Sequence, residues 1–300
     1  SLMYVMLLVG MVGGGAFFST ALADFSPTRL VQVVQGAALL AVLLNGISAW
    51  KQEARDPTRR RHKAEPAEAF GPRWRAFIAQ PGARRFLWTV GLGTAAFNMQ
   101  DVVLEPYGGE ILGLGVGATS ALTALMAAGA LAAFALAAHR LSRGADPHRL
   151  AALGLVAGLP AFAAVVFAAP LEAPWMFRAG TVLIGFGSGL FAVGTLTAAM
   201  SLERPGQAGL ALGAWGAVQA TAGGAAIAAG GAVRDVVSTL ATQGALGEAL
   251  QSAVTGYSFV YHIEIYLLFA ALVAIGPLVR SIASPAHPAG AKFGLADLPG

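Results

Sequence analysis

A short polar segment within an apolar stretch holds the residues of this sequence that are best suited to chemistry. In the run FNMQDVVLEPYGGE, the polar side chains Asn98, Asp101 and Glu105 follow one another at intervals of three and four residues. An α-helix turns by about 100° per residue, so these three would form one stripe about 60° wide, whereas Gln100 would point away from it. Pro106 would then end the helix.

A second polar group enters with the last apolar stretch of the chain. His262 and Tyr266 would share one helix face at i, i+4 spacing, and Glu264 would be displaced from that face. These residues are expected at about the same depth as the first stripe, so a polar cluster between the two segments is geometrically possible. Gln219, midway along the preceding apolar stretch, is expected to be a further buried amide.

Each of these side chains also has a structural interpretation. Glu105 and Glu110 could be solvated at the end of their helix, and a lone histidine such as His262 near a membrane surface is more often hydrogen-bonded than a ligand. Asp101 lies about one turn inside, where an ionisable group is costly, and this favours a functional role. An aromatic belt at the membrane surface is the preferred interpretation of Tyr257, Tyr261 and Tyr266.

The composition indicates whether the helices that carry these residues lie in water or in a membrane. Apolar residues make up 56% of the 300 residues and charged residues 11%, against about 25% charged in a typical soluble protein. The mean hydropathy is +0.67. We therefore expect an integral membrane protein. The absence of cysteine excludes disulfide scaffolds, thiolate metal sites and cysteine nucleophiles, and the five histidines are too scattered for a multi-histidine centre.

Apolar stretches long enough to cross a bilayer recur along the chain. A hydrocarbon core of about 30 Å needs about 20 helical residues, and the runs are continuous and rich in Ala, Leu and Gly, which indicates helices rather than barrel strands. This rule predicts eight spans: Tyr4–Ala23, Leu30–Trp50, Phe86–Glu105, Gly115–Ala138, Leu150–Ala169, Phe177–Met200, Leu210–Val233 and Phe259–Val279. Close packing between them is predicted at the small-residue pairs Gly10/Gly14, Gly154/Gly158, Gly185/Gly189 and Gly209/Gly213.

The distribution of Lys and Arg predicts the orientation. Ten of the nineteen fall within Lys51–Arg85, and six more would lie on the same side if every span crosses once, whereas three would lie on the other side. Short cytoplasmic loops retain basic residues, so the linker and the C-terminus are expected to be cytoplasmic. The same pattern explains the net charge of +4 through topology rather than through binding of nucleic acid.

The long connections divide the chain. Residues 1–50 would be the last two transmembrane helices of an N-terminal bundle, 51–85 a basic cytoplasmic linker, 86–280 a six-helix C-terminal bundle, and 281–300 a cytoplasmic tail. Within the linker, Phe70–Ile78 could lie in the headgroup plane as an interfacial helix. On the opposite side, Arg234–Ser258 has an apolar stripe and could form a surface helix.

Two helical bundles joined by a basic linker resemble the plan of the major facilitator superfamily. The fold class predicted on this basis is an all-α integral membrane protein, a major-facilitator-type helical bundle with eight transmembrane helices present. The chain starts at Ser1 and enters a hydrophobic span almost at once, so we expect about four further helices upstream in the natural protein. The loop AHRLSRGADPHRL resembles the basic loop of this superfamily, with Ser142 in place of its usual acidic residue.

A more specific resemblance rests on FNMQDVVLEPYGG and the following ILGLGVGATSALTAL. These segments resemble the bacteriochlorophyll-delivery branch of the superfamily, which contains the PucC- and LhaA-type light-harvesting assembly proteins. The resemblance runs through most of Phe86–Arg280 and implies a role in assembling antenna complexes in the intracytoplasmic, that is inner, membrane of a phototrophic bacterium. The implied partners are light-harvesting antenna polypeptides or the reaction-centre complex, together with membrane lipids and no nucleic acid.

The ligand implied by this resemblance is bacteriochlorophyll. Its magnesium accepts one axial N or O donor, for which Asn98, Asp101 and His262 are the candidates. The wider set of residues expected to bind pigment or a partner is Asn98, Gln100, Asp101, Glu105, Gln219, His262 and Glu264.

Two other functions stay open. A secondary transporter could couple a small solute to protons through Asp101 or Glu105, and a structural subunit could remain bound to a photosynthetic complex without chemistry of its own. No enzyme is expected, because no nucleophilic triad or Walker loop is present, and Gly185–Gly189 lacks the preceding strand that a nucleotide-binding loop needs.

Overall fold

The structure, a computed structural model, describes residues 2–49, 70–202 and 209–281, and every regular element in these residues is helical. In chain order the elements are α1 (Leu2–Ala21), α2 (Pro27–Ala49), α3 (Phe70–Ile78), α4 (Ala83–Asn98), the 3₁₀ turn η2 (Met99–Val102), α5 (Leu104–Pro106), the π-helical turn η3 (Tyr107–Ile111), α6 (Val116–Leu141), α7 (Pro147–Ala168), α8 (Pro174–Ser201), α9 (Leu210–Thr242), the 3₁₀ turn η4 (Glu248–Leu250) and α10 (Val254–Ser281).

Among the described residues, six helices are long and apolar enough to cross a membrane, namely α2, α6, α7, α8, α9 and α10. Of the other two predicted spans, the first corresponds to α1, which has 20 residues. The predicted span Phe86–Glu105 is interrupted after Asn98. The chain is therefore a multi-pass membrane protein by length and composition, whereas the eight-span count and the major facilitator plan stay predictions.

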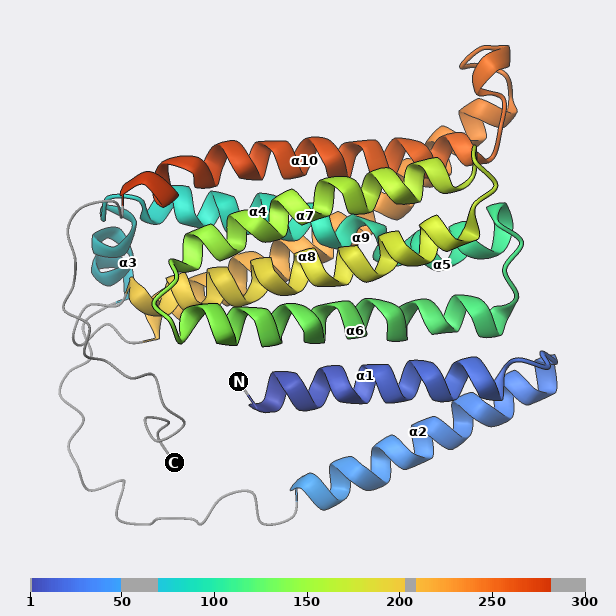
Figure 1. Ribbon diagram of the computed structural model, residues 1–300, viewed down its shortest axis with the longest axis horizontal. Helices are drawn as coiled ribbons and strands as arrows, with labels where there is room; N and C mark the ends of the chain where they lie inside the picture. Colours follow the sequence, from blue (N-terminus) through green and yellow to red (C-terminus); the bar gives the residue numbers. More distant parts are fainter. Residues whose placement is uncertain (1, 50–69, 203–208, 282–300) are drawn as a thin grey trace.

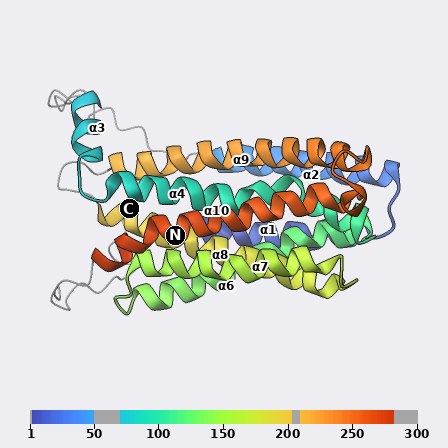
Figure 2. The ribbon, with the colours of Figure 1, turned by 90° about the horizontal axis from the view of Figure 1, so that it is seen from above.

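The long helices run side by side along the long axis of the molecule (Figure 1). In the two perpendicular views, α10 lies on one face of the bundle and α1 and α2 lie on the opposite face (Figures 1 and 2). Within the bundle α8 packs against both α6 and α7, and α1 packs against α6. The basic helix α3 and the turn between α6 and α7 lie at one end, and the turn between α9 and α10 lies at the other.

Glycine residues, which have no side chain, allow some helices to approach closely. A Cβ atom on Gly185 would lie 1.9 Å from the carbonyl oxygen of Met126, and one on Gly154 would lie 2.5 Å from that of Gly187. Glycine is therefore required where α8 crosses α6 and α7. The other two predicted pairs make no such contact, because an added Cβ would have nothing within 4 Å at Gly10, Gly14, Gly209 and Gly213.

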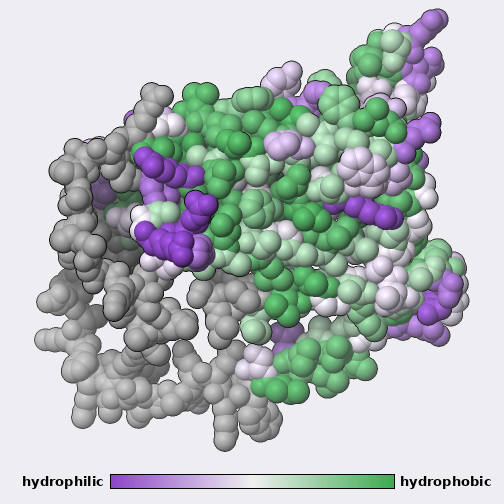
Figure 3. Space-filling view, viewed as in Figure 1, coloured by the Kyte–Doolittle hydropathy of each residue, from purple (hydrophilic) through white to green (hydrophobic). Residues whose placement is uncertain are grey.

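The outer surface is apolar, as lipid-facing helices require. Hydrophobic residues cover most of the middle of the face in Figure 3, and hydrophilic residues gather toward its ends. On α2, large apolar side chains such as Leu39, Val42 and Ile47 are exposed. Apolar exposure on this scale suits contact with lipid tails or with another helix.

The aromatic belt predicted from three tyrosines is wrong for two of them. Tyr257 and Tyr261 are buried, and their rings pack edge-on against Tyr107 at centroid distances of 5.4 and 5.5 Å. Tyr266 is exposed. The buried tyrosines belong to the bundle core because α10 turns that face toward α7 and η3.

The predicted connections differ in outcome. Phe70–Ile78 forms a helix, as expected for its amphipathic pattern. The separate surface helix expected after Arg234 is wrong, because α9 continues without interruption to Thr242, and the turn that follows reverses at Gly244, where φ is +77°. The linker over residues 50–69 and the tail over 282–300 lie outside the described residues.

Candidate functional site

The first polar segment lies where a membrane helix breaks. Helix α4 ends at Asn98, whose side-chain amide donates a 2.7 Å hydrogen bond to the carbonyl of Thr94. Such side-chain bonds compete with the backbone ladder of the helix. Pro106 has no N–H to donate to the carbonyl of Val102, four residues before it. The 3₁₀ turn η2 ends at Val102. The chain then stays helical through Pro106 and reverses at Gly113, where φ is +65°, so the expectation that Pro106 ends the helix is wrong.

The break rotates the polar side chains out of the predicted stripe. Gln100, expected to point away from the site, is fully buried, whereas Asp101 is exposed. The amide nitrogen of Gln100 lies 2.5 Å from Oδ1 of Asp101 and 3.7 Å from the sulfur of Met126 on α6. The single stripe assumed an uninterrupted α-helix, whereas a 3₁₀ turn has three residues per turn.

Glu264 supplies a carboxyl group from α10 to the same region. Its side chain is completely buried, in the neighbourhood of Gln100, Asp101 and Tyr261. Neither of its carboxyl oxygens has a hydrogen-bond partner among the described residues, and the same is true of Oε1 of Gln100. Burial of unpaired polar atoms is costly. The structure thus brings Gln100, Asp101 and Glu264 together, at the junction of the broken helix and α10.

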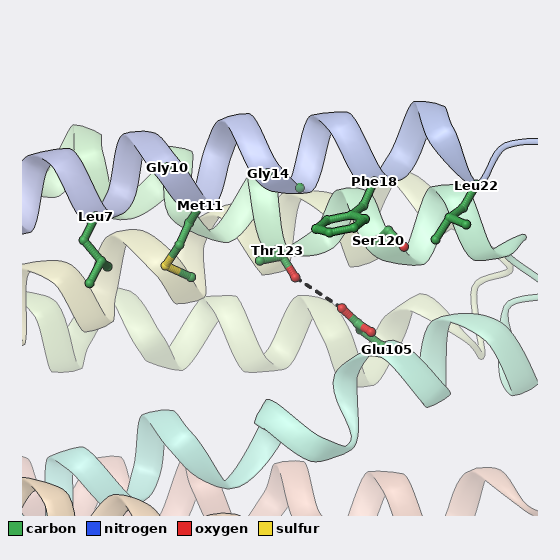
Figure 4. Close-up of a pocket in the computed structure, with 10 residues that line it drawn as sticks. Leu7, Gly10, Met11, Gly14, Phe18, Leu22, Glu105, Ser120 and Thr123 are labelled. Atoms are coloured by element: carbon green, nitrogen blue, oxygen red, sulfur yellow. Dashed lines mark hydrogen bonds between the residues drawn. The ribbon is translucent and has the colours of Figure 1, made fainter. Parts of the chain in front are cut away.

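Glu105 belongs to a different surface, a groove between α1, α5 and α6 (Figure 4). The groove encloses about 450 Å³, and its wall is mainly apolar. Glu105 projects into it and accepts a 3.2 Å hydrogen bond from Thr123 of α6 through Oε1. Glu105 is its only ionisable lining residue among those described; the others are Leu7, Gly10, Met11, Gly14, Gly15, Phe18, Leu22, Ser120 and Thr123.

A charged cluster missed by sequence reasoning lies where η3 meets α9 and α10. Arg234 forms a 2.8 Å ion pair with Glu110 and a 2.7 Å ion pair with Asp235, and its guanidinium lies over the ring of Tyr257. Tyr257 donates a 2.6 Å hydrogen bond to Glu110. The sequence predicts Arg234 at the start of a connection that could form a surface helix, and it allows Glu110 to be solvated at a helix end. No Gly or Pro separates Arg234 from Thr242, and this signal could have predicted that α9 continues.

The remaining predicted site residues are Asn98, Gln219 and His262, and none of them lines the groove at Glu105. Asn98 is half-buried and faces α9, with its Oδ1 3.7 Å from the position of a Cβ on Gly223. Gln219 is half-buried one turn before Gly223. His262 is exposed on the side of α10 away from Glu264. The structure therefore does not bring Asn98, Asp101 and His262 around one ligand, and their roles stay predictions.

A comparison with known protein families decides the identity of the chain. The model of the family described as PUCC protein matches residues 1–283. The chain belongs to the PucC family. The resemblance to PucC-type proteins stated from the sequence is thereby confirmed.

Two curated relatives of this PucC-family chain come from Rhodovulum sulfidophilum and Rhodobacter capsulatus. It is 51% identical over 238 residues to Protein PucC of Rhodovulum sulfidophilum, covering 79% of this chain and 52% of that protein. It is 47% identical, over 100% of this chain and 63% of the relative, to a Rhodobacter capsulatus protein described as uncharacterized, in the puhA-bchM intergenic region.

A more distant relative is named Bacteriochlorophyll synthase 44.5 kDa chain, also from Rhodobacter capsulatus. The identity is 28% over 229 residues, which are 74% of this chain and 52% of that protein. The PucC-family chain thus spans about half to two thirds of the length of the curated relatives described here. No solved structure matches it.

Proposed function

We propose that this PucC-family chain is part of a light-harvesting complex assembly factor, which handles bacteriochlorophyll and helps to deliver it to antenna polypeptides in the intracytoplasmic membrane. Membership of the family and the name of the more distant relative support the pigment class. Bacteriochlorophyll is the cargo of this activity rather than a resident cofactor, and no chemical conversion of it is proposed.

The observation that carries the proposal is the groove at Glu105. A magnesium chlorin is a large apolar sheet with one axial position that accepts a hard oxygen or nitrogen donor. The groove offers an apolar wall and one carboxylate, held in place by Thr123, and small residues of α1 keep it open. Ligand sites are typically apolar concavities with a few placed polar groups. Glu105 would hold the magnesium, and the apolar wall would take the ring edge or the hydrocarbon tail.

Antenna yield in a phototrophic host that lacks its own copy of the protein tests this proposal. Glu105→Leu removes both oxygen donors but keeps the wall apolar, so we expect antenna absorbance per cell to fall several-fold. Glu172→Gln, at the exposed turn between α7 and α8, is the matched control and should restore normal absorbance. Normal antenna assembly by Glu105→Leu would contradict a role for the groove.

One observation favours a second function, proton-coupled transport of a small solute. Discontinuous membrane helices are typical of ion sites in secondary transporters, and at the break after α4 the buried carboxyl group of Glu264 lies near Gln100 and the exposed Asp101. Transport predicts solute uptake into proteoliposomes that Asp101→Asn abolishes. A third function, that of a structural subunit of an antenna or reaction-centre complex, predicts instead that the chain remains in the mature complex in fixed stoichiometry.

A further inference from the structure

His262 lies on the outer face of the bundle, far from the groove. It is exposed on α10, which occupies the face opposite α1 and α2 (Figures 1 and 2). It is eight residues from the start of that helix, which corresponds to about 12 Å along the axis, and it falls inside the candidate span Val254–Val279. An ionisable side chain directed outward from a candidate membrane span is a functional hypothesis.

The hydrogen bonding of the imidazole leaves one nitrogen ready to bind a metal. Nδ1 lies 2.6 Å from the carbonyl oxygen of Ser258. A carbonyl oxygen only accepts, so Nδ1 carries the proton and, in the neutral ring, Nε2 keeps its lone pair. Metal-binding histidines are commonly oriented in this way, through a hydrogen bond from the other ring nitrogen.

The surface around His262 is apolar and partly aromatic. Exposed side chains continue its stripe at intervals of three and four residues: Phe259, Tyr266, Phe269 and Val273, with exposed fractions of 51, 70, 52 and 78%. The only carboxylate of α10, that of Glu264, is buried on the other side of the helix. The face therefore offers one nitrogen donor surrounded by rings and aliphatic groups.

A single nitrogen donor on an apolar face suits a metal held in a tetrapyrrole better than a free metal ion. A free divalent ion such as zinc needs three or four protein ligands, and the described residues contain no group of three or more side chains that could hold one. A metal already held by the four nitrogens of a tetrapyrrole needs only one axial ligand, and its flat ring needs an apolar surface to lie against.

We infer that His262 is an axial ligand for a magnesium tetrapyrrole that lies against the outer face of α10, between Phe259 and Tyr266. This is a second pigment position, separate from the groove at Glu105, and its assignment to a magnesium pigment rests on the proposed function. Because it faces outward, a partner in the membrane can reach the pigment without passing through the bundle.

Titration of the full chain in phosphatidylcholine nanodiscs with zinc protoporphyrin IX tests the site, because this fluorescent probe takes a single axial ligand. We expect His262→Ala to remove the imidazole-dependent shift of the Soret band and to weaken binding at this position by about tenfold or more. Free imidazole should restore the shift in His262→Ala. The matched control is His139→Ala, which removes an exposed histidine at the other end of the bundle and should bind like the unsubstituted chain.

The assignment would be overturned by a Soret shift and an affinity that are the same in His262→Ala and in the unsubstituted chain, including the case in which neither binds the probe. This result would leave the proposal for the groove untouched, because the antenna yield of Glu105→Leu is measured independently.

Discussion

Tyr257 of α10 donates a 2.6 Å hydrogen bond to the carboxylate of Glu110, 147 positions earlier in the chain. The same carboxylate pairs with Arg234 of α9, so one small cluster joins η3, α9 and α10 at the end of the bundle where α9 and α10 are connected. Beyond Val103 the broken helix continues as the short segments α5 and η3, and the cluster ties η3 to α9 and α10.

Removal of the Tyr257 hydroxyl should destabilise that end. Tyr257→Phe keeps the ring that packs on Tyr107 but loses the hydrogen bond to Glu110, and hydrogen bonds inside membrane proteins contribute about 0.5–1 kcal/mol each. We expect the midpoint of thermal unfolding in detergent to fall by a few degrees. Tyr266→Phe, on the exposed face, should leave it unchanged, and equal midpoints for all three proteins would contradict the role of the cluster.

The crossing of α8 with α6 predicts opposite effects for two glycine substitutions. In Gly185→Ala the new Cβ would lie 1.9 Å from a backbone oxygen, which must move, so we expect a loss of about 1–3 kcal/mol or failure to fold. Gly213→Ala adds a Cβ in open space and should be neutral or stabilising by about 0.5–1 kcal/mol. Chemical denaturation measures both, and tolerance of Gly185→Ala would contradict the close crossing.

The unpaired carboxyl group of Glu264 predicts an unusual response to an apolar substitution. Replacement of a buried, unpartnered polar group by an apolar one of similar size removes a cost of about 1–3 kcal/mol. We therefore expect Glu264→Met to unfold at the same temperature as the unsubstituted chain or higher. A clear loss of stability in Glu264→Met would contradict the view that this carboxyl group is unpaired.

Thr123 is expected to act as a positioning residue for Glu105. Thr123→Val keeps the shape of the side chain but removes the hydrogen bond, so the amount of pigment that copurifies with the protein should fall while the unfolding temperature stays the same. Thr123→Ser should restore pigment content. The control is Thr119→Val, whose hydroxyl bonds only a carbonyl of its own helix, and an equal loss in this control would contradict a specific role.

Sequence reasoning predicted the long apolar helices and the short helix at Phe70–Ile78, because length, hydropathy and amphipathic spacing are local properties. It predicted the wrong faces for Gln100 and Asp101, because a helical wheel assumes a continuous α-helix. A helical wheel also takes no account of the hydrogen bond from the Asn98 side chain to the backbone. It also could not decide which face of α10 is buried. His262 and Glu264 are two residues apart, so they face different ways, and only packing against α4 and α7 turns Glu264 inward.

The absorption spectrum of the detergent-purified full chain tests the central claim most directly. The account predicts a bacteriochlorophyll band in the unsubstituted protein and in Glu172→Gln, and a band reduced several-fold in Glu105→Leu at the same protein concentration. Bands of equal height in all three proteins, or no pigment in any of them, would contradict it.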